Sequence, residues 1–139
     1  MYRIMGIDYG SVRIGLSLSD PMRIIASGLK TILNNGHAVE EITSIIHEQD
    51  VRKIVVGMPL NLKGEPGIKV EEVERFIGLL KEKTSVEIVT HDERFTSVMA
   101  QKAILSMGTT KKQRRDKSKI DEVASAILLQ SFLDSKTGV

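Results

Sequence analysis

The chain is predicted to form an α/β fold, with a five-stranded mixed sheet and helices on both of its faces. Apolar runs of strand length, separated by turn residues, open the chain and predict an antiparallel meander. Later runs of this kind alternate with segments whose apolar residues recur at helical spacing, which predicts parallel strands joined by crossover helices. A length of 139 residues and a hydrophobic fraction of 41% suit one compact domain, expected to span residues 1–139.

The meander is expected to contain three strands. Tyr2 to Ile7 and Ile14 to Ser19 are apolar runs joined by a turn around Gly10 and Ser11, and a third strand is expected near Ile24 to Thr31. Strands joined by such short turns run antiparallel.

The middle of the chain is expected to alternate between helix and strand. Val39 to Ile46 carries apolar residues at helical spacing, and the apolar run at 52–57, RKIVVG, follows it. Prolines and glycines mark 59–67 as a loop. A second helix over Val70 to Leu80 and a strand over Val86 to Thr90 complete the sheet. Because each of these strands is reached through a helix, both are expected to be parallel strands.

The last third of the chain is expected to contain two helices with a basic segment between them. Thr96 or Ser97 is suited to cap a helix that ends near Gly108, and Ser118 is suited to open a final helix that ends near Leu133. The basic segment is either a solvated loop or a phosphate-binding element of a nucleic-acid interface. Its basic residues are Lys111, Lys112, Arg114, Arg115, Lys117 and Lys119.

The composition argues against several classes of protein. No apolar run approaches the ~20 residues of a membrane helix, and the N-terminus lacks the design of a signal peptide. We therefore expect no membrane partner and a cytoplasmic location. The chain has no cysteine, which excludes disulfides and thiolate metal sites. With three Phe, two Tyr and no Trp, base stacking on an aromatic platform is not expected, and recognition is expected to depend on shape and phosphate.

Asp8 is an acid between two glycines at the end of the first apolar run. Alternation places it on the strand face that carries Ile4 and Gly6, in a strand expected to be central and buried. Two interpretations are open. Asp8 accepts hydrogen bonds from the turn at Gly10 and Ser11, or it is a metal ligand at the edge where open α/β sheets place their ligands.

Further acids are expected at the same edge of the sheet. The sequence HDE at 91–93 follows the last strand, and Asp121 lies near the start of the last helix. Asp121 has an alternative role, because Ser118 three residues earlier makes a capping box with it possible.

The small residues Ala124 and Ser125 would let the last helix lie close to Gly6 and bring Asp121 near Asp8. Neighbouring carboxylates repel one another unless a cation neutralises them. Sets of oxygen ligands suit Mg²⁺ or Mn²⁺, and a pair of such ions activates water and stabilises the leaving oxygen in phosphodiester cleavage. The pattern therefore predicts a metal-dependent nuclease.

Four ordered motifs resemble those of the YqgF/RuvX family of bacterial proteins: GIDYGSVRIGLSLSD, VVGMPLNLKG, DERFTS and KIDEVASAILLQSFL. The resemblance runs from end to end and implies a ribonuclease H-like fold. It also implies a nuclease that matures the 5′ end of pre-16S ribosomal RNA or, alternatively, a Holliday junction resolvase. By matching positions, Asp8, Glu93 and Asp121 are the implied catalytic and metal-binding acids. Arg13 and Arg94 match family arginines that hold phosphate or form structural ion pairs.

The position of Glu93 departs from the usual pattern of the fold. In ribonuclease H-like nucleases an acid ends the fourth strand, which lies next to the first, whereas here that strand ends VVGMPL. Glu93 follows the fifth strand instead, two strand spacings of ~4.8 Å from Asp8. The loop that carries Glu93 is therefore expected to curl inward, and Asp92 is the alternative ligand.

Two other classes of protein are alternatives to an enzyme of this kind. GIDYGSVRIG also resembles the first phosphate motif of actin-like and sugar-kinase ATPases, but no second Asp-Gly phosphate turn follows in this chain. A non-catalytic nucleic-acid-binding scaffold is the other alternative. The choice between structured RNA and branched DNA stays open, as does that between a monomer and a homodimer.

Overall fold

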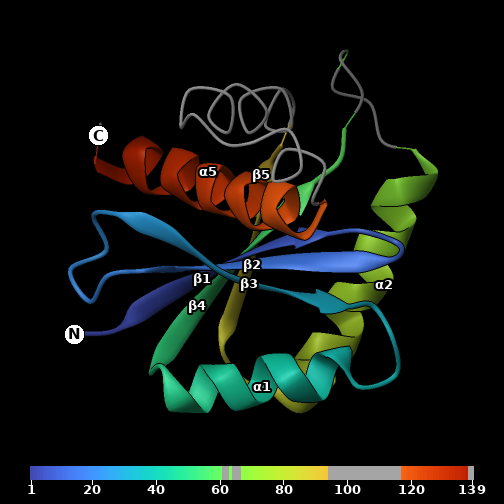
Figure 1. Ribbon diagram of the computed structural model, residues 1–139, viewed down its shortest axis with the longest axis horizontal. Coiled ribbons are helices and arrows are strands. Elements are labelled where there is room, and N and C mark those ends of the chain that lie inside the picture. Colours follow the sequence, from blue (N-terminus) through green and yellow to red (C-terminus); the bar gives the residue numbers. More distant parts are fainter. Residues whose placement is uncertain (61–62, 64–66, 94–116, 138–139) are drawn as a thin grey trace.

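The structure, a computed structural model, describes residues 1–60, 63, 67–93 and 117–137. Five strands form one sheet in the order β3-β2-β1-β4-β5. β2 runs antiparallel to both β1 and β3, whereas β4 is parallel to β1 and to β5 (Figure 1). The predicted combination of a meander with two parallel strands is confirmed. The strands are β1 Arg3–Tyr9, β2 Arg13–Ser19, β3 Ala26–Leu33, β4 Val51–Met58 and β5 Glu87–Asp92.

Helices cover both faces of the sheet, as predicted. α1 (Ala38–Glu48) and α2 (Ile68–Lys83) lie on one face, and α5 (Lys117–Thr137) lies across the other (Figure 1). In the part of the chain that the structure describes, no helix is long and apolar enough to cross a membrane.

The third strand begins and ends two residues later than predicted. The Asp20 carboxylate accepts hydrogen bonds from the backbone N of Ile24 at 2.7 Å and of Ile25 at 2.9 Å. These bonds hold both residues in the loop before β3, so their apolar character was misleading as a strand signal. The first strand also differs: it continues to Tyr9, so that Asp8 lies within β1.

The last helix starts earlier than predicted. α5 begins at Lys117, so Ser118 lies inside the helix rather than at its cap, and Lys117 and Lys119 belong to the helix rather than to a basic loop. The helix predicted from Thr96 or Ser97 to Gly108 falls outside the described residues.

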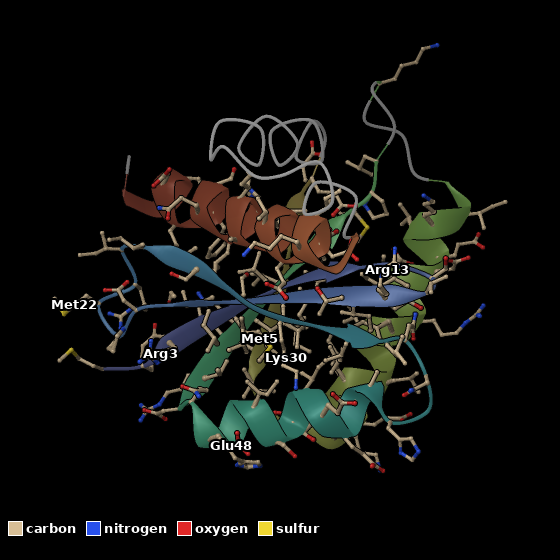
Figure 2. The ribbon with its side chains drawn as sticks, viewed as in Figure 1. Arg3, Met5, Arg13, Met22, Lys30 and Glu48 are labelled. Atoms are coloured by element: carbon tan, nitrogen blue, oxygen red, sulfur yellow. The ribbon has the colours of Figure 1, made fainter. Side chains whose placement is uncertain are left out.

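The two faces of β1 pack into separate parts of the core. Met5 and Ile7 lie in a cluster with residues of α1 and α2, and Figure 2 shows Met5 on the side of the sheet that faces α1. Ile4 packs on the opposite face with Leu129 of α5. The predicted alternation is confirmed, and burial of both faces is typical of a central strand.

Gly6 lets α5 approach the middle of β1. Ser125 Oγ donates a hydrogen bond to the Gly6 carbonyl at 3.0 Å, and Ser17 Oγ donates to the Ser125 carbonyl at 2.9 Å. A Cβ at position 6 would lie 2.9 Å from Leu129 Cβ, closer than real Cβ atoms come. The predicted small-residue packing is confirmed, and it fixes where α5 carries Asp121 over the sheet.

Candidate active site

Asp8 lies near the end of the central strand. It pairs with Gly15 of β2 on one side, and β4 runs along the other side of β1. Its carboxylate accepts a hydrogen bond from the carboxyl group of Glu93. In the described part of the chain, the alternative in which the turn backbone at Gly10 and Ser11 satisfies Asp8 is not observed.

Glu93 reaches Asp8 across β4. The backbone N of Glu93 donates a hydrogen bond to the Met58 carbonyl at 3.3 Å, which turns the chain inward directly after β5. The side chain then lies over Gly57, where an added Cβ would overlap Glu93 Oε2. The inward curl of this loop, expected from the sequence, is confirmed. A glycine at this buried position of β4 provides the space for the carboxyl group.

Asp8 and Glu93 keep a shared proton at pH values well above those at which a carboxyl group ordinarily loses it. The pKa of Glu93 is raised from 4.5 to about 8, mainly by burial and also by the charge of Asp8 and the hydrogen bond to it. Burial also raises the pKa of Asp8, although the hydrogen bond from Glu93 opposes that rise. At neutral pH and without a cation, Glu93 is therefore the protonated donor and Asp8 the acceptor.

A pocket of about 290 Å³ opens beside the two acids, and we call it the carboxylate pocket. Its wall includes Tyr9 from β1 and Lys69 and Glu72 from the start of α2. The positive charge of Lys69 lowers the pKa of both acids. Lys69 was not among the site residues predicted from the sequence. The available signal was its place in the first turn of the helix that follows the strand ending at the site.

Asp121 lies close to this pair but is engaged elsewhere. α5 places the Asp121 carbonyl against Gly15, where a Cβ would overlap it, and Gly15 is the strand partner of Asp8. The Asp121 carboxylate accepts a hydrogen bond from Arg13 Nε at 2.9 Å, and Figure 2 shows Arg13 at the end of the sheet near the start of α5. Its charge still raises the pKa of Asp8.

This geometry bears on two pairs of alternatives left by the sequence. Arg13 forms the ion pair that was one of its two expected roles, and its contact with phosphate stays a prediction. Asp121 lies beyond the first turn of α5, which contains no acid, so it does not form a capping box with Ser118.

The oxygen donors of the carboxylate pocket fit a hard divalent cation. Mg²⁺ is usually held by one or two carboxylates together with water and substrate phosphates, and Asp8 and Glu93 supply such a pair. A cation would take the place of the shared proton and relieve the repulsion between the two charges. Among the described residues, no three His, Cys, Asp or Glu side chains are arranged to hold a metal, and Asp121 pairs with Arg13 instead. Of the three acids expected to hold a metal, Asp8 and Glu93 lie together in the pocket, and Asp121 lies nearby in its ion pair with Arg13.

Two further residues lie away from the carboxylate pocket. His91 faces α5, with its Nε2 3.1 Å from Ser131 Oγ, and Lys119 is exposed on α5. Lys117 is the first residue of α5. Five predicted phosphate-binding residues lie outside the described part of the chain: Arg94, Lys111, Lys112, Arg114 and Arg115.

The raised pKa values predict that the metal-free protein loses stability as the pH rises. Below about pH 4.5, Glu93 is protonated in both the folded and the unfolded chain. Between that pH and about 8, only the folded chain keeps the proton, so the unfolding free energy falls by up to about 1.4 kcal/mol per pH unit. Thermal melts in EDTA across this range measure the effect.

The same melts with a divalent cation serve as the comparison. Mn²⁺ should raise the melting temperature at pH 8, because the shared proton dissociates readily at this pH and leaves the carboxylates free to bind the cation. At pH 5 Mn²⁺ should have little effect, because the bound proton competes with it. A metal-free stability that is flat across this range would contradict the shared-proton arrangement.

The Arg13–Asp121 ion pair should stabilise α5 against the sheet. Both side chains are partly buried, at 30% and 26% exposure, so a double-mutant cycle of Arg13→Ala and Asp121→Asn should give a coupling of about 1 kcal/mol. The exposed pair Arg52–Asp50, at 63% and 62%, is the control and should couple by less than about 0.5 kcal/mol. Equal coupling in both pairs would mean that Arg13 does not hold α5.

Comparison with known proteins adds independent evidence. A sequence model of the family described as "RuvX: Holliday junction resolvase" matches residues 2–135. A Bacteroides fragilis protein named "Putative pre-16S rRNA nuclease" is 39% identical over 139 residues, which is 98% of this chain and 99% of the relative. A Sulfurihydrogenibium protein of the same name is 41% identical over 136 residues, with 96% and 91% covered.

Solved structures support the fold. Thermus thermophilus RuvC in complex with Holliday junction substrate has a TM-score of 0.61 at 15% identity, and the match covers 99% of this chain and 97% of that one. The fowlpox virus resolvase in complex with Holliday junction DNA has a TM-score of 0.57 at 10% identity, with 96% and 98% covered. At these identities the likeness concerns the fold, and it confirms the expected ribonuclease H-like class.

Proposed function

This chain belongs to the RuvX (YqgF) family of nucleases, and on that basis we propose that it hydrolyses phosphodiester bonds at the 5′ end of pre-16S ribosomal RNA, using divalent metal ions. The observation that carries the proposal is the pair of partly buried acids, Asp8 and Glu93, which share a proton in a pocket at the end of the central strand. Such a pair is costly to bury and is useful where a cation is to be bound.

Asp8 and Glu93 would hold the metal, with Asp121 as the nearby third acid. When bound, Mg²⁺ or Mn²⁺ polarises a phosphodiester oxygen and lowers the pKa of a water. Lys69 supplies a positive charge on the same pocket wall, where it attracts a substrate phosphate. The two described acids account for one ion, and the second ion of a two-metal mechanism remains a prediction.

The names of the relatives favour RNA as the substrate. Both relatives described above are named for pre-16S rRNA, which is structured RNA. The description of the family model supports the second candidate, cleavage of Holliday junctions in branched DNA. A resolvase needs paired sites to cut two strands symmetrically, so that alternative predicts a homodimer, whereas an RNA-processing nuclease can be a monomer.

One experiment tests the proposal against both alternatives. The purified chain is incubated with Mg²⁺ or Mn²⁺ and either a precursor 16S RNA fragment or a four-way DNA junction, beside Asp8→Asn and an EDTA control. We expect the RNA to be cut, the junction to stay intact, and the variant and the EDTA sample to be inactive. Cleavage of the junction alone would favour a resolvase. Binding of RNA without any cleavage would favour a scaffold, and equal cleavage by Asp8→Asn would contradict the assigned site.

A further inference from the structure

A second pocket, also of about 290 Å³, adjoins the carboxylate pocket. It lies between α2, the turn after β1 and the loop after β3, and it shares Tyr9, Ser11 and Glu72 with the carboxylate pocket. The two pockets are therefore neighbours that share part of their walls. We call the second one the tyrosine groove, and the residues that matter for its chemistry are Tyr9, Ser11, Asn34, Glu72, Arg75 and Phe76.

The tyrosine groove is lined by the partly buried Tyr9, which packs on the buried Phe76, and by polar side chains. The rings of Tyr9 and Phe76 lie 4.7 Å apart at an angle of 39°. Asn34 Nδ2 donates a hydrogen bond to the Gly10 carbonyl at 2.8 Å, which leaves its side-chain oxygen as an acceptor at the rim. Phe76 is only 4% exposed, so the partly buried Tyr9 is the ring that the groove offers to an unstacked base, beside amide and hydroxyl groups that suit its sugar. The volume is near the lower limit of small-molecule sites, as expected for a single nucleotide.

Three charged residues of α2, alternating in sign, lead from the carboxylate pocket to the tyrosine groove. Lys69, Glu72 and Arg75 are spaced three residues apart and so lie on one helix face. Lys69 lies in the carboxylate pocket, Arg75 lies in the tyrosine groove, and Glu72 is common to both. In the described part of the chain, neither Glu72 nor Arg75 has an ion-pair partner. Both charges are therefore available to a ligand.

This order of charges matches a segment of an RNA strand. Phosphates alternate with sugars along the strand, and each ribose carries a 2′-hydroxyl that can donate a hydrogen bond. A phosphate beside the acids and Lys69 would place the next sugar near Glu72 and the next phosphate near Arg75. The Glu72 carboxylate repels phosphate but accepts a hydrogen bond from a hydroxyl group.

We propose that the tyrosine groove binds the nucleotide next to the scissile phosphodiester, with Arg75 at its phosphate and Glu72 at its ribose 2′-hydroxyl. The inference rests on the proposed function, because it takes the carboxylate pocket as the place of cleavage. Arg75 and Glu72 are then positioning residues, and Glu72 favours RNA over DNA.

Binding is measured on the full chain in EDTA, so that the proposed metal-dependent cleavage does not interfere. The probes are fluorescently labelled ten-nucleotide single strands of RNA and of DNA with the same sequence, followed by anisotropy over a series of salt concentrations. Arg75→Ala should weaken binding of both probes about tenfold and lower the slope of log affinity against log salt by about 0.7, since one phosphate contact is lost. Arg75→Lys should retain the slope.

Two further variants test specificity and position. Glu72→Ala should lower the ratio of RNA affinity to DNA affinity about fivefold, because only RNA loses a hydrogen bond. Lys81→Ala removes a positive charge from α2 at an exposed site that lines neither pocket, and it should match the wild type in affinity and slope. The proposal would be overturned if Arg75→Ala kept the affinity and salt slope of the wild type. It would also be overturned if Lys81→Ala lost as much affinity as Arg75→Ala, or if the wild type bound neither probe.

The cleavage assay with the precursor RNA separates this inference from the proposed function. Arg75→Ala should raise KM for the RNA more than it lowers kcat. Cleavage by the wild type with unchanged kinetics in Arg75→Ala would leave the nuclease assignment standing and reject the groove. No cleavage by the wild type, together with the expected loss of salt slope in Arg75→Ala, would reject the nuclease assignment and leave the groove as a nucleotide site.

Discussion

Glu93→Gln is expected to reduce metal-dependent cleavage about a thousandfold while making the metal-free protein more stable at pH 8. The activity falls because an amide cannot supply the negative charge that holds the cation, and such charge stabilisation is worth several kcal/mol in the transition state. The stability rises because the wild-type carboxyl, with its pKa raised to about 8 by burial and by Asp8, has to lose its proton inside the fold. Cleavage rates and melts in EDTA measure the two effects on the same samples.

Asp92→Asn is the matched control for this variant. Asp92 is the adjacent acid and the alternative ligand, and its charge contributes to the raised pKa of Glu93. The control should cleave RNA at close to the wild-type rate, since the hydrogen bond to Asp8 comes from Glu93. Loss of activity in Asp92→Asn with normal activity in Glu93→Gln would transfer the ligand role to Asp92. For Glu93→Gln, the expected loss of activity together with a gain in stability is typical of substitutions at a residue that serves function at a cost in stability.

The elements of the fold could be predicted where the signal is local. Met5 and Ile7 alternate with Ile4 along β1, and apolar spacing of this kind shows which faces are buried whatever the partner is. The docking of α5 was predictable for a related reason. A helix with small residues and a strand with Gly6 have complementary shapes, and the two hydrogen bonds of Ser125 with β1 and β2 follow from that approach.

The partners of the charged residues could not be predicted from local signals. Arg13 and Asp121 are 108 positions apart, and nothing near either residue in the sequence shows that they pair. The start of α5 at Lys117 was missed because Ser118 has good capping chemistry but lies inside the helix. Lys69 was missed because a lysine in a helix is usually solvated, and only the approach of α2 to the end of β1 gives it a role.

Gly57 itself is the signal in the sequence for the contact that Glu93 makes across β4. A glycine in a buried central strand weakens that strand unless something must come close to the backbone. β4 ends without an acid, and the carboxyl group of Glu93, directly after β5, fills the space above Gly57. The chain therefore supplies this carboxyl group from the residue after β5, and Gly57 of β4 leaves the room for it.

Gly57→Ala is expected to lower cleavage about 100-fold with Glu93 itself intact. The new Cβ would overlap Glu93 Oε2 and would also lie 3.0 Å from Leu128 Cδ2, so the carboxyl group has to leave its place over β4. A displacement of about 1 Å at a reacting centre is enough for a loss of this size. The affinity for Mn²⁺, measured by calorimetry, should fall with the rate, and the stability should fall by about 1–3 kcal/mol through overpacking.

Two comparisons identify Glu93 as the cause of that loss. Gly78→Ala introduces the same methyl group in α2, where nothing lies within 4 Å, and should leave cleavage unchanged while stabilising the helix by up to about 1 kcal/mol. The double variant Gly57→Ala/Glu93→Gln should be no less active than Glu93→Gln alone, because the glycine acts only through that carboxyl group. Full activity and metal affinity in Gly57→Ala, or losses that add in the double variant, would show that the reach of Glu93 across β4 is not what builds the site.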